Sequence, residues 1–303
     1  MTKGIKLFLG VIILIVIFSF MGKYLFENWQ QVPFQKLKFN YALLIASFLI
    51  YACCFILGGF IWKTSLSFVG ENLSLIKSLR ISAFSYMARY IPGKVWGIVG
   101  QVWFTKKEGN IPGEKSGVCV VINTVTGILS SLLLALIIFP FALQGTFGKR
   151  FYILFALIPL FFVILYPSIF IRVVNFGLKK LKREVIKVVP KYTQILELLL
   201  LYIFGWILTC SGVYFLISSF YPMKSSFFIP LCGIYPGAWV IGFLSLVTPG
   251  GLGVREGVLS YFLSFYMPVS VGIIASIIIR IWATIGEFVF FAIFARGIKK
   301  YIT

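Results

Sequence analysis

The stretch "SLVTPGGLGVREGVL", residues 245–259, breaks an otherwise apolar run of the sequence. Pro249 removes a backbone hydrogen-bond donor and ends a helix, and the glycines that follow it allow the chain to turn sharply. The adjacent charges Arg255 and Glu256 come directly after this break. The environment around the stretch must therefore tolerate both interrupted backbone and two ionised side chains.

The composition places this stretch in a membrane protein. Hydrophobic residues make up 60% of the 303 residues and charged residues only 12%, whereas soluble domains are near half apolar and a quarter charged. The net charge is +20, and the sequence contains no Asp and no His. Since His is the usual general base and a common metal ligand, we expect no enzyme activity, no catalytic residue, no metal and no cofactor. The five cysteines lie in apolar runs without metal-ligand spacing.

The predicted fold class is an all-α polytopic integral membrane protein. Apolar segments of spanning length cover roughly 5–22, 40–62, 116–140, 150–172, 194–220 and 269–295. The first of them follows a basic start but lacks a small-residue cleavage site, so we interpret it as a spanning helix and not as a signal peptide. Two further apolar stretches, 72–108 and 226–267, each contain a Pro-Gly break near the middle.

Basic residues give the orientation of these segments. The segment 172–191 holds seven basic residues and one acid, and such segments face the cytoplasm. The N- and C-termini are predicted to be cytoplasmic as well. These assignments agree only if 72–108 and 226–267 each enter and leave on one face, as re-entrant hairpins from opposite sides. The single membrane domain, 1–303, then divides into inverted halves of about 1–145 and 150–303, a feature of alternating-access transporters.

The second hairpin offers an anion site. Broken backbone at membrane depth is tolerated only where protein buries it or a wet cavity surrounds it. The returning arm begins near Gly253, where free N–H groups favour an anion. Arg255 adds a planar fork suited to phosphate. Glu256 is predicted to be its counter-charge, or the partner of another basic residue.

The first hairpin and the last helix carry further candidates. Arg89, Lys94 and Gln101 flank the break at Pro92 and Gly93. Arg280 and Glu287 are seven residues apart and share one helix face. Charges at such depth cost about 2.5–3.5 kcal/mol each unless they are paired or wet. The candidate substrate-binding residues are therefore Arg89, Lys94, Gln101, Arg255, Glu256, Arg280 and Glu287.

Structural roles compete with each of these assignments. Arg280 and Glu287 could form an ion pair between helices, and Arg89 and Lys94 could extend to the cytoplasmic interface. Arg255 and Glu256 could close the hairpin. Trp96 and Trp103 could be anchors at the membrane–water interface, where Trp is enriched. For 172–191, whose apolar and basic faces alternate, we favour a helix lying on anionic lipid.

The motifs "RYIPGKVWG" (89–97) and "TPGGLGVREG" (248–257) make the sequence similar to a known family, the lysylphosphatidylglycerol synthase transmembrane, or flippase-like, domains. The resemblance covers essentially the whole chain and implies inverted repeats, re-entrant helices and movement of lipids between leaflets. By the match, Pro92 and Gly93 belong to the first hairpin motif, and the second contains Pro249, Gly250, Gly251 and Gly253. "PGKVWG" departs from the Pro-Gly-Arg-x-Gly pattern of many relatives. Because the chain ends at Thr303, we expect the lysine-attaching synthase domain to be absent.

The leading functional hypothesis is a flippase or scramblase for an anionic-headed lipid: a polyprenyl-phosphate-linked saccharide, a glycolipid or a phospholipid. The alternatives are an integral-membrane transferase of envelope glycan or lipid synthesis, and a small-solute transporter or channel. A non-transporting partner of a polysaccharide assembly complex is a fourth. The expected location is the bacterial cytoplasmic (inner) membrane. The expected partners are membrane lipids, with no nucleic acid; a homo-oligomer and envelope-biosynthesis proteins stay open.

Overall fold

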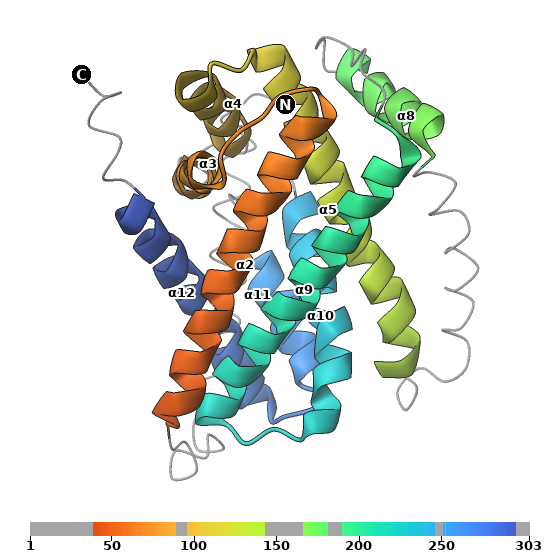
Figure 1. The fold of residues 1–303 in the computed structure, drawn as a ribbon. Coiled ribbons are helices and arrows are strands. Elements are labelled where there is room, and N and C mark those ends of the chain that lie inside the picture. The colour runs from red at the N-terminus through yellow and green to blue at the C-terminus, as the bar shows by residue number, and fades with distance from the viewer. Residues whose placement is uncertain are drawn as a thin grey trace, which may run out of the picture.

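The computed structural model describes residues 39–88, 96–142, 166–180, 190–245, 251 and 253–294, and Figure 1 shows their arrangement. These residues form helices without a strand, so the all-α polytopic class is confirmed. Five helical segments are long and apolar enough to cross a membrane: α2 (Tyr41–Phe68), α5 (Gly113–Ala142), α9 (Tyr192–Phe220), α10 (Phe228–Leu244) with the short η4 (Ser225–Phe227) before it, and α12 (Val269–Phe294).

Four of the predicted spanning segments, 40–62, 116–140, 194–220 and 269–295, correspond to α2, α5, α9 and α12. The segment 5–22 lies outside the described residues, and so does most of 150–172. The end of 150–172 instead begins α8 (Pro167–Lys180), which continues into the basic segment. Proline suits the first position of a helix because its missing N–H has no intrahelical partner there.

The long helices α2 and α9 run in opposite directions along the bundle. Asn40 caps α2 through its side-chain oxygen, which accepts from the backbone N–H groups of Ala42 and Leu43. The backbone N–H of Asn40 donates to the carbonyl of Ser219 at 2.7 Å. The start of α2 and the end of α9 therefore share one end of the bundle, the lower end in Figure 1.

The first broken stretch is a helical hairpin at the opposite end, made of α3 (Leu75–Ala88) and α4 (Trp96–Gly109). Its two ends meet beside the end of α2, where Lys115 Nζ lies 2.5 Å from Glu71 Oε1. The arms contact each other through Phe84 and Phe104, whose ring centroids are 4.1 Å apart. The stretch therefore enters and leaves at one end of the bundle, and its break at Pro92 and Gly93 lies outside the described residues.

The second broken stretch is also a hairpin, made of α10 and α11 (Val254–Leu263). The rings of Phe227, just before α10, and Tyr266, just after α11, have centroids 5.0 Å apart. Entry and exit therefore lie together, at the lower end of Figure 1 and away from the α3–α4 hairpin. The sequence predicts a broken stretch over 226–267, yet α10 with η4 reaches the length of a crossing helix. Length and composition alone do not distinguish a crossing helix from a long hairpin arm.

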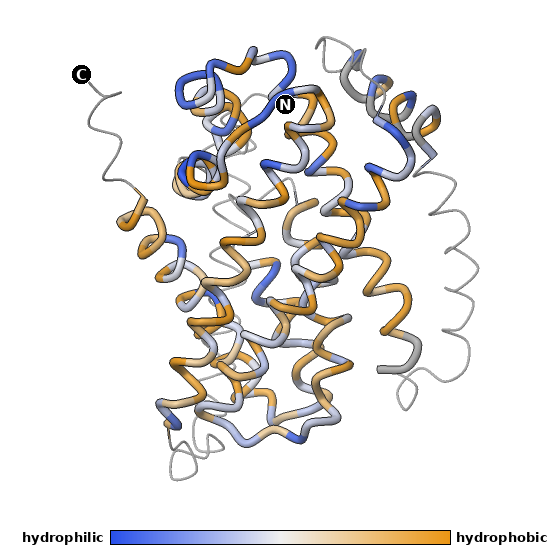
Figure 2. The backbone as a smooth tube through the Cα atoms, in the orientation of Figure 1, coloured by the Kyte–Doolittle hydropathy of each residue, from blue (hydrophilic) through white to orange (hydrophobic). Residues whose placement is uncertain are grey.

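The surface of the bundle suits a hydrocarbon environment. Large apolar side chains on its long helices are exposed, among them Leu49, Leu200 and Phe288. Figure 2 shows hydrophilic residues gathered at the end that holds α3, α4 and α8, with hydrophobic colour along the long helices. A hydrophilic segment also lies within the apolar bundle at α11. Polar groups at that depth need a protein partner or a cavity.

Candidate functional site

Glycines at the tip of the second hairpin bring its two arms into contact. Gly251 and Gly253 have φ angles of +72° and +79°, in the left-handed region that favours glycine. A Cβ atom on Gly251 would lie 2.5 Å from the carbonyl oxygen of Gly242 in α10. One on Gly242 would lie 2.8 Å from the Cβ of Arg255. This close approach sets the direction of the first turn of α11; Pro249 and Gly250 lie outside the described residues.

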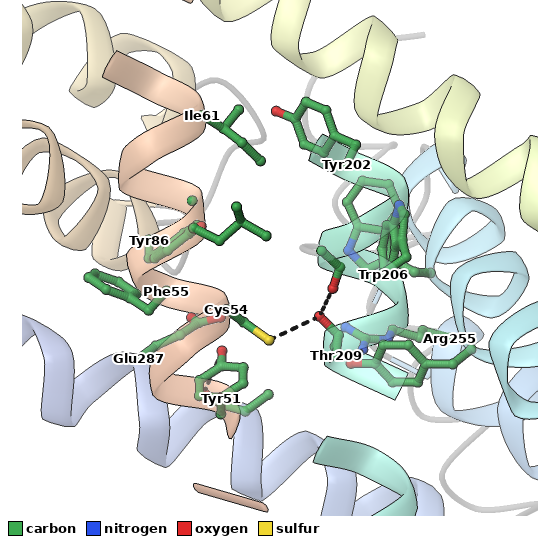
Figure 3. A pocket seen from close by; sticks show the side chains of 16 residues that line it. Tyr51, Cys54, Phe55, Ile61, Tyr86, Tyr202, Trp206, Thr209, Arg255 and Glu287 are labelled. Atoms are coloured by element: carbon green, nitrogen blue, oxygen red, sulfur yellow. Dashed lines mark hydrogen bonds between the residues drawn. The ribbon is translucent and has the colours of Figure 1, made fainter. Parts of the chain in front are cut away.

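A cavity of about 240 Å³ lies between the hairpins and the long helices. Figure 3 shows that it separates a wall of α2, α3 and α12 from a wall of α9, α10 and α11. The first hairpin contributes Tyr86, and the second contributes Tyr235, Trp239 and Arg255. The other lining residues come from α2, α9 and α12: Tyr51, Cys54, Phe55, Leu57, Gly58, Ile61, Tyr202, Gly205, Trp206, Thr209, Ala283 and Glu287.

Arg255 is the cation of this lining. Its guanidinium carbon lies 4.9 Å from the centre of the Tyr235 ring, and its Nη2 donates to the Tyr235 hydroxyl. In the described parts of the chain, no carboxylate lies within ion-pair distance of Arg255. Among these described residues, an aromatic face and a neutral hydroxyl balance its charge beside the cavity.

Glu256 has a different environment from its neighbour. Its side chain is 4% exposed. Its Oε2 accepts from the backbone N–H of Gly253 at 2.7 Å, and its Oε1 lies 3.9 Å from Nε of Arg280. Of the two roles expected for Glu256, the structure has the second, the partner of another basic residue, which is Arg280. Arg280 therefore pairs with Glu256, and the expected pair of Arg280 with Glu287 is not seen among the described residues. Neither Glu256 nor Arg280 lines the cavity.

The remaining predicted site residues fall into three groups. Glu287 of α12 is buried and lines the cavity on the wall opposite Arg255 (Figure 3). Gln101 belongs to α4 and does not line it. Arg89 and Lys94 lie outside the described residues. Trp96 and Trp103 are 47% and 44% exposed, which is compatible with interface anchors.

A set of polar contacts that the sequence did not predict lies behind the cavity wall. The Tyr202 hydroxyl donates to Oδ1 of Asn123 at 3.0 Å, and Nδ2 of Asn123 donates to Oγ of Ser65 at 2.8 Å. Nε1 of Trp206 donates to Oγ of Ser130 at 3.1 Å. Asn123 and Ser130 are seven residues apart, so they share one face of α5. That spacing was a usable signal inside an otherwise apolar segment.

Replacing the buried Asn123 with Leu is expected to lower the free energy of unfolding by about 1–3 kcal/mol, because the partly buried Tyr202 hydroxyl and the buried Ser65 hydroxyl lose their partner. Thr124→Val is the matched control, since the Thr124 hydroxyl donates only to Val120 O in its own helix, and it should change stability by about 0.5 kcal/mol or less. Thermal unfolding of the purified protein in detergent measures both. Equal losses for the two variants would contradict a stabilising role of the Asn123 contacts.

Comparison with known families identifies the chain. The family described as "Lysylphosphatidylglycerol synthase TM region" matches residues 7–290. The chain belongs to this family. The match includes both hairpins and every helix that lines the cavity, and it confirms the predicted membership. The family is a membrane domain associated with lipid-related, flippase-like function. A comparison with curated proteins found no match.

Proposed function

We propose that this protein transfers lipids with an anionic head group between membrane leaflets, and that the head group binds at Arg255 in the cavity. The supporting observation is the cavity-facing guanidinium without a carboxylate partner in the described residues. A charge at membrane depth costs about 2.5–3.5 kcal/mol unless it is paired or wet. An anionic ligand would remove that cost, so the site is complementary to one.

The chemistry of the site favours a phosphate-bearing head group. The guanidinium fork matches the oxygens of phosphate. The first turn of α11 follows directly on Gly253, and the N-terminus of a helix attracts anions. Phospholipids, glycolipids with a phosphate and polyprenyl-phosphate-linked saccharides all carry this group.

The size of the cavity supports a path for the head group alone. Its volume of about 240 Å³ is below the range of about 300–1,000 Å³ that is usual for drug-sized ligands. In the proposed mechanism the acyl or prenyl tails therefore stay in the surrounding lipid while the head group passes through the bundle. The apolar exposed faces of the long helices fit this arrangement.

The proposed transport cycle uses the two hairpins as alternating barriers. Both contribute to the wall of the cavity, and they enter the bundle from opposite ends. Inverted repeats with broken helices at the midplane generate this kind of access. The inverted repeat of halves 1–145 and 150–303, the cytoplasmic termini and the bacterial inner-membrane location belong to the proposal.

Proteoliposomes with tail-labelled fluorescent lipids test this function. Dithionite bleaches label in the outer leaflet only, so the bleached fraction reports transfer between leaflets. Wild type should transfer phosphatidylglycerol faster than protein-free vesicles do, and faster than it transfers phosphatidylcholine, whose head group has no net charge. Equal rates with and without protein, for phosphatidylglycerol and for polyprenyl phosphate alike, would contradict the proposal.

A cavity-filling variant tests the route. Thr209→Phe places a ring between the walls and leaves Arg255 in place. It is expected to slow transfer by about tenfold or more, which corresponds to about 1.4 kcal/mol. Ile207→Phe is the control, since Ile207 lies on the same helix and is exposed. Equal effects of the two variants would place the lipid path outside the cavity.

A further inference from the structure

We propose that the ion pair between Arg280 of α12 and Glu256 of α11 positions the start of α11. It thereby sets the direction in which the Arg255 side chain enters the cavity. The inference rests on the proposed function for the role of Arg255 as a head-group ligand. It assigns to Glu256 and Arg280 a role without substrate contact. Their position outside the cavity lining is the first argument for it.

The Glu256 carboxylate is fully used by the protein. One oxygen accepts from the Gly253 backbone at 2.7 Å and the other lies 3.9 Å from Arg280. A carboxylate three residues into a helix that accepts from the N-cap N–H fixes the helix start. Gly253 has no side chain that could cap α11 itself. Glu256 therefore ties the first turn of α11 to α12, as Arg255 ties it to α10.

The helical geometry links this anchor to Arg255. Successive residues of an α-helix point in directions about 100° apart, so the rotation that turns Glu256 toward α12 also turns Arg255 toward the cavity. The backbone before α11 contains Gly251 and Gly253 at positive φ. Glycine permits many backbone angles, so this segment does not fix the rotation by itself. The contact with Arg280 adds a constraint from α12 to the close approach of α10.

Amide hydrogen exchange of the purified protein in detergent measures how firmly the start of α11 is held, without any ligand. Arg280→Met is expected to speed exchange of the amides of residues 257–260 by about tenfold or more. These amides donate back to the first turn of α11, as Gly257 N–H does to the Gly253 carbonyl at 2.8 Å, so they exchange faster when that turn opens more easily. Exchange in α2 should not change. Arg80→Met is the matched control, since Arg80 also lies 3.9 Å from a buried glutamate, Glu108 of the first hairpin. Unchanged exchange at 257–260 in Arg280→Met would overturn the positioning role.

A double-mutant cycle tests whether the Arg280–Glu256 pair affects ligand affinity through Arg255. The probe is dihexanoyl phosphatidylglycerol, and its affinity is measured by intrinsic fluorescence, which the cavity residues Trp206 and Trp239 provide. Arg280→Met should weaken binding by about tenfold with Arg255 present, but by about twofold or less in an Arg255→Ala background. Equal losses in both backgrounds would mean that Arg280 acts through something other than Arg255, and would overturn the inference.

Conservative variants separate positioning from a folding defect. Arg280→Lys keeps the positive charge and should stay within about threefold of wild-type affinity. Glu256→Gln keeps an oxygen for the Gly253 N–H, so its amides at 257–260 should exchange more slowly than those of Glu256→Ala. The reverse order would contradict the cap. If wild type fails to bind the probe while Arg280→Met still loosens α11, the proposed function fails and the positioning role stands.

Discussion

Transfer of phosphatidylglycerol by an Arg255→Ala variant is expected to be about 10- to 150-fold slower than by wild type. A hydrogen bond to a charged group contributes about 1.5–3 kcal/mol, which corresponds to that range. Arg255 is the cation whose partners in the described residues are limited to the Tyr235 ring and hydroxyl. Its removal should therefore reduce recognition of the head group without leaving a buried carboxylate unpaired. The dithionite assay in proteoliposomes measures the rate.

Two further variants make this expectation specific. Arg255→Lys keeps the charge but loses the planar fork, so its loss should be smaller than that of Arg255→Ala. Arg172→Ala removes an exposed arginine of α8 and should transfer lipid at the wild-type rate. An Arg255→Ala protein that is folded and as fast as wild type would contradict head-group binding at this residue.

The Gly251→Ala variant is expected to lose about 2–6 kcal/mol of folding free energy. A left-handed backbone conformation costs a non-glycine residue about 1–3 kcal/mol, and overpacking adds about 1–3 kcal/mol. At Gly251 both terms apply, because φ is +72° and a Cβ would lie 2.5 Å from the Gly242 carbonyl oxygen. The second hairpin should then open, so transfer should be lost as well. Thermal unfolding and the proteoliposome assay measure the two effects.

Gly70→Ala is the matched control for this variant. Gly70 has nearly the same φ, +78°, but no atom lies within 4 Å of the position of its Cβ. It should therefore cost only about 1–2 kcal/mol, from backbone strain alone. If the two variants were equally stable, the contact between Gly251 and Gly242 would not hold the hairpin arms together.

The features that could be predicted best from the sequence are those that a membrane requires of it, such as long apolar helices. Unbroken apolar runs predicted α2, α5, α9 and α12, because a crossing helix needs a continuous apolar length. The break before Gly251 predicted the turn between α10 and α11, since proline and glycine act through local backbone geometry. Arg255 was predicted to face a cavity, and it does. Each of these inferences depends on residues close together in the chain.

The partners of the charges could not be obtained in the same way. Glu256 contacts Arg280 of another helix, and Arg255 contacts Tyr235 of α10. These contacts depend on how α11 is rotated against its neighbours, which the sequence does not encode locally. The Asn123–Tyr202 contact likewise joins residues that lie far apart in the chain. The rotation of packed helices is set by their side-chain ridges and close glycine contacts.

The helix α12 contacts both hairpins at once. Near its end Phe291 packs against Phe84 of α3, with ring centroids 5.0 Å apart, and near its middle Arg280 lies beside Glu256 of α11. These two contacts are about 16 Å apart along the helix at 1.5 Å per residue. A tilt of this helix that loosened one contact would also displace the other. We therefore expect the positions of the two hairpins to be coupled through α12.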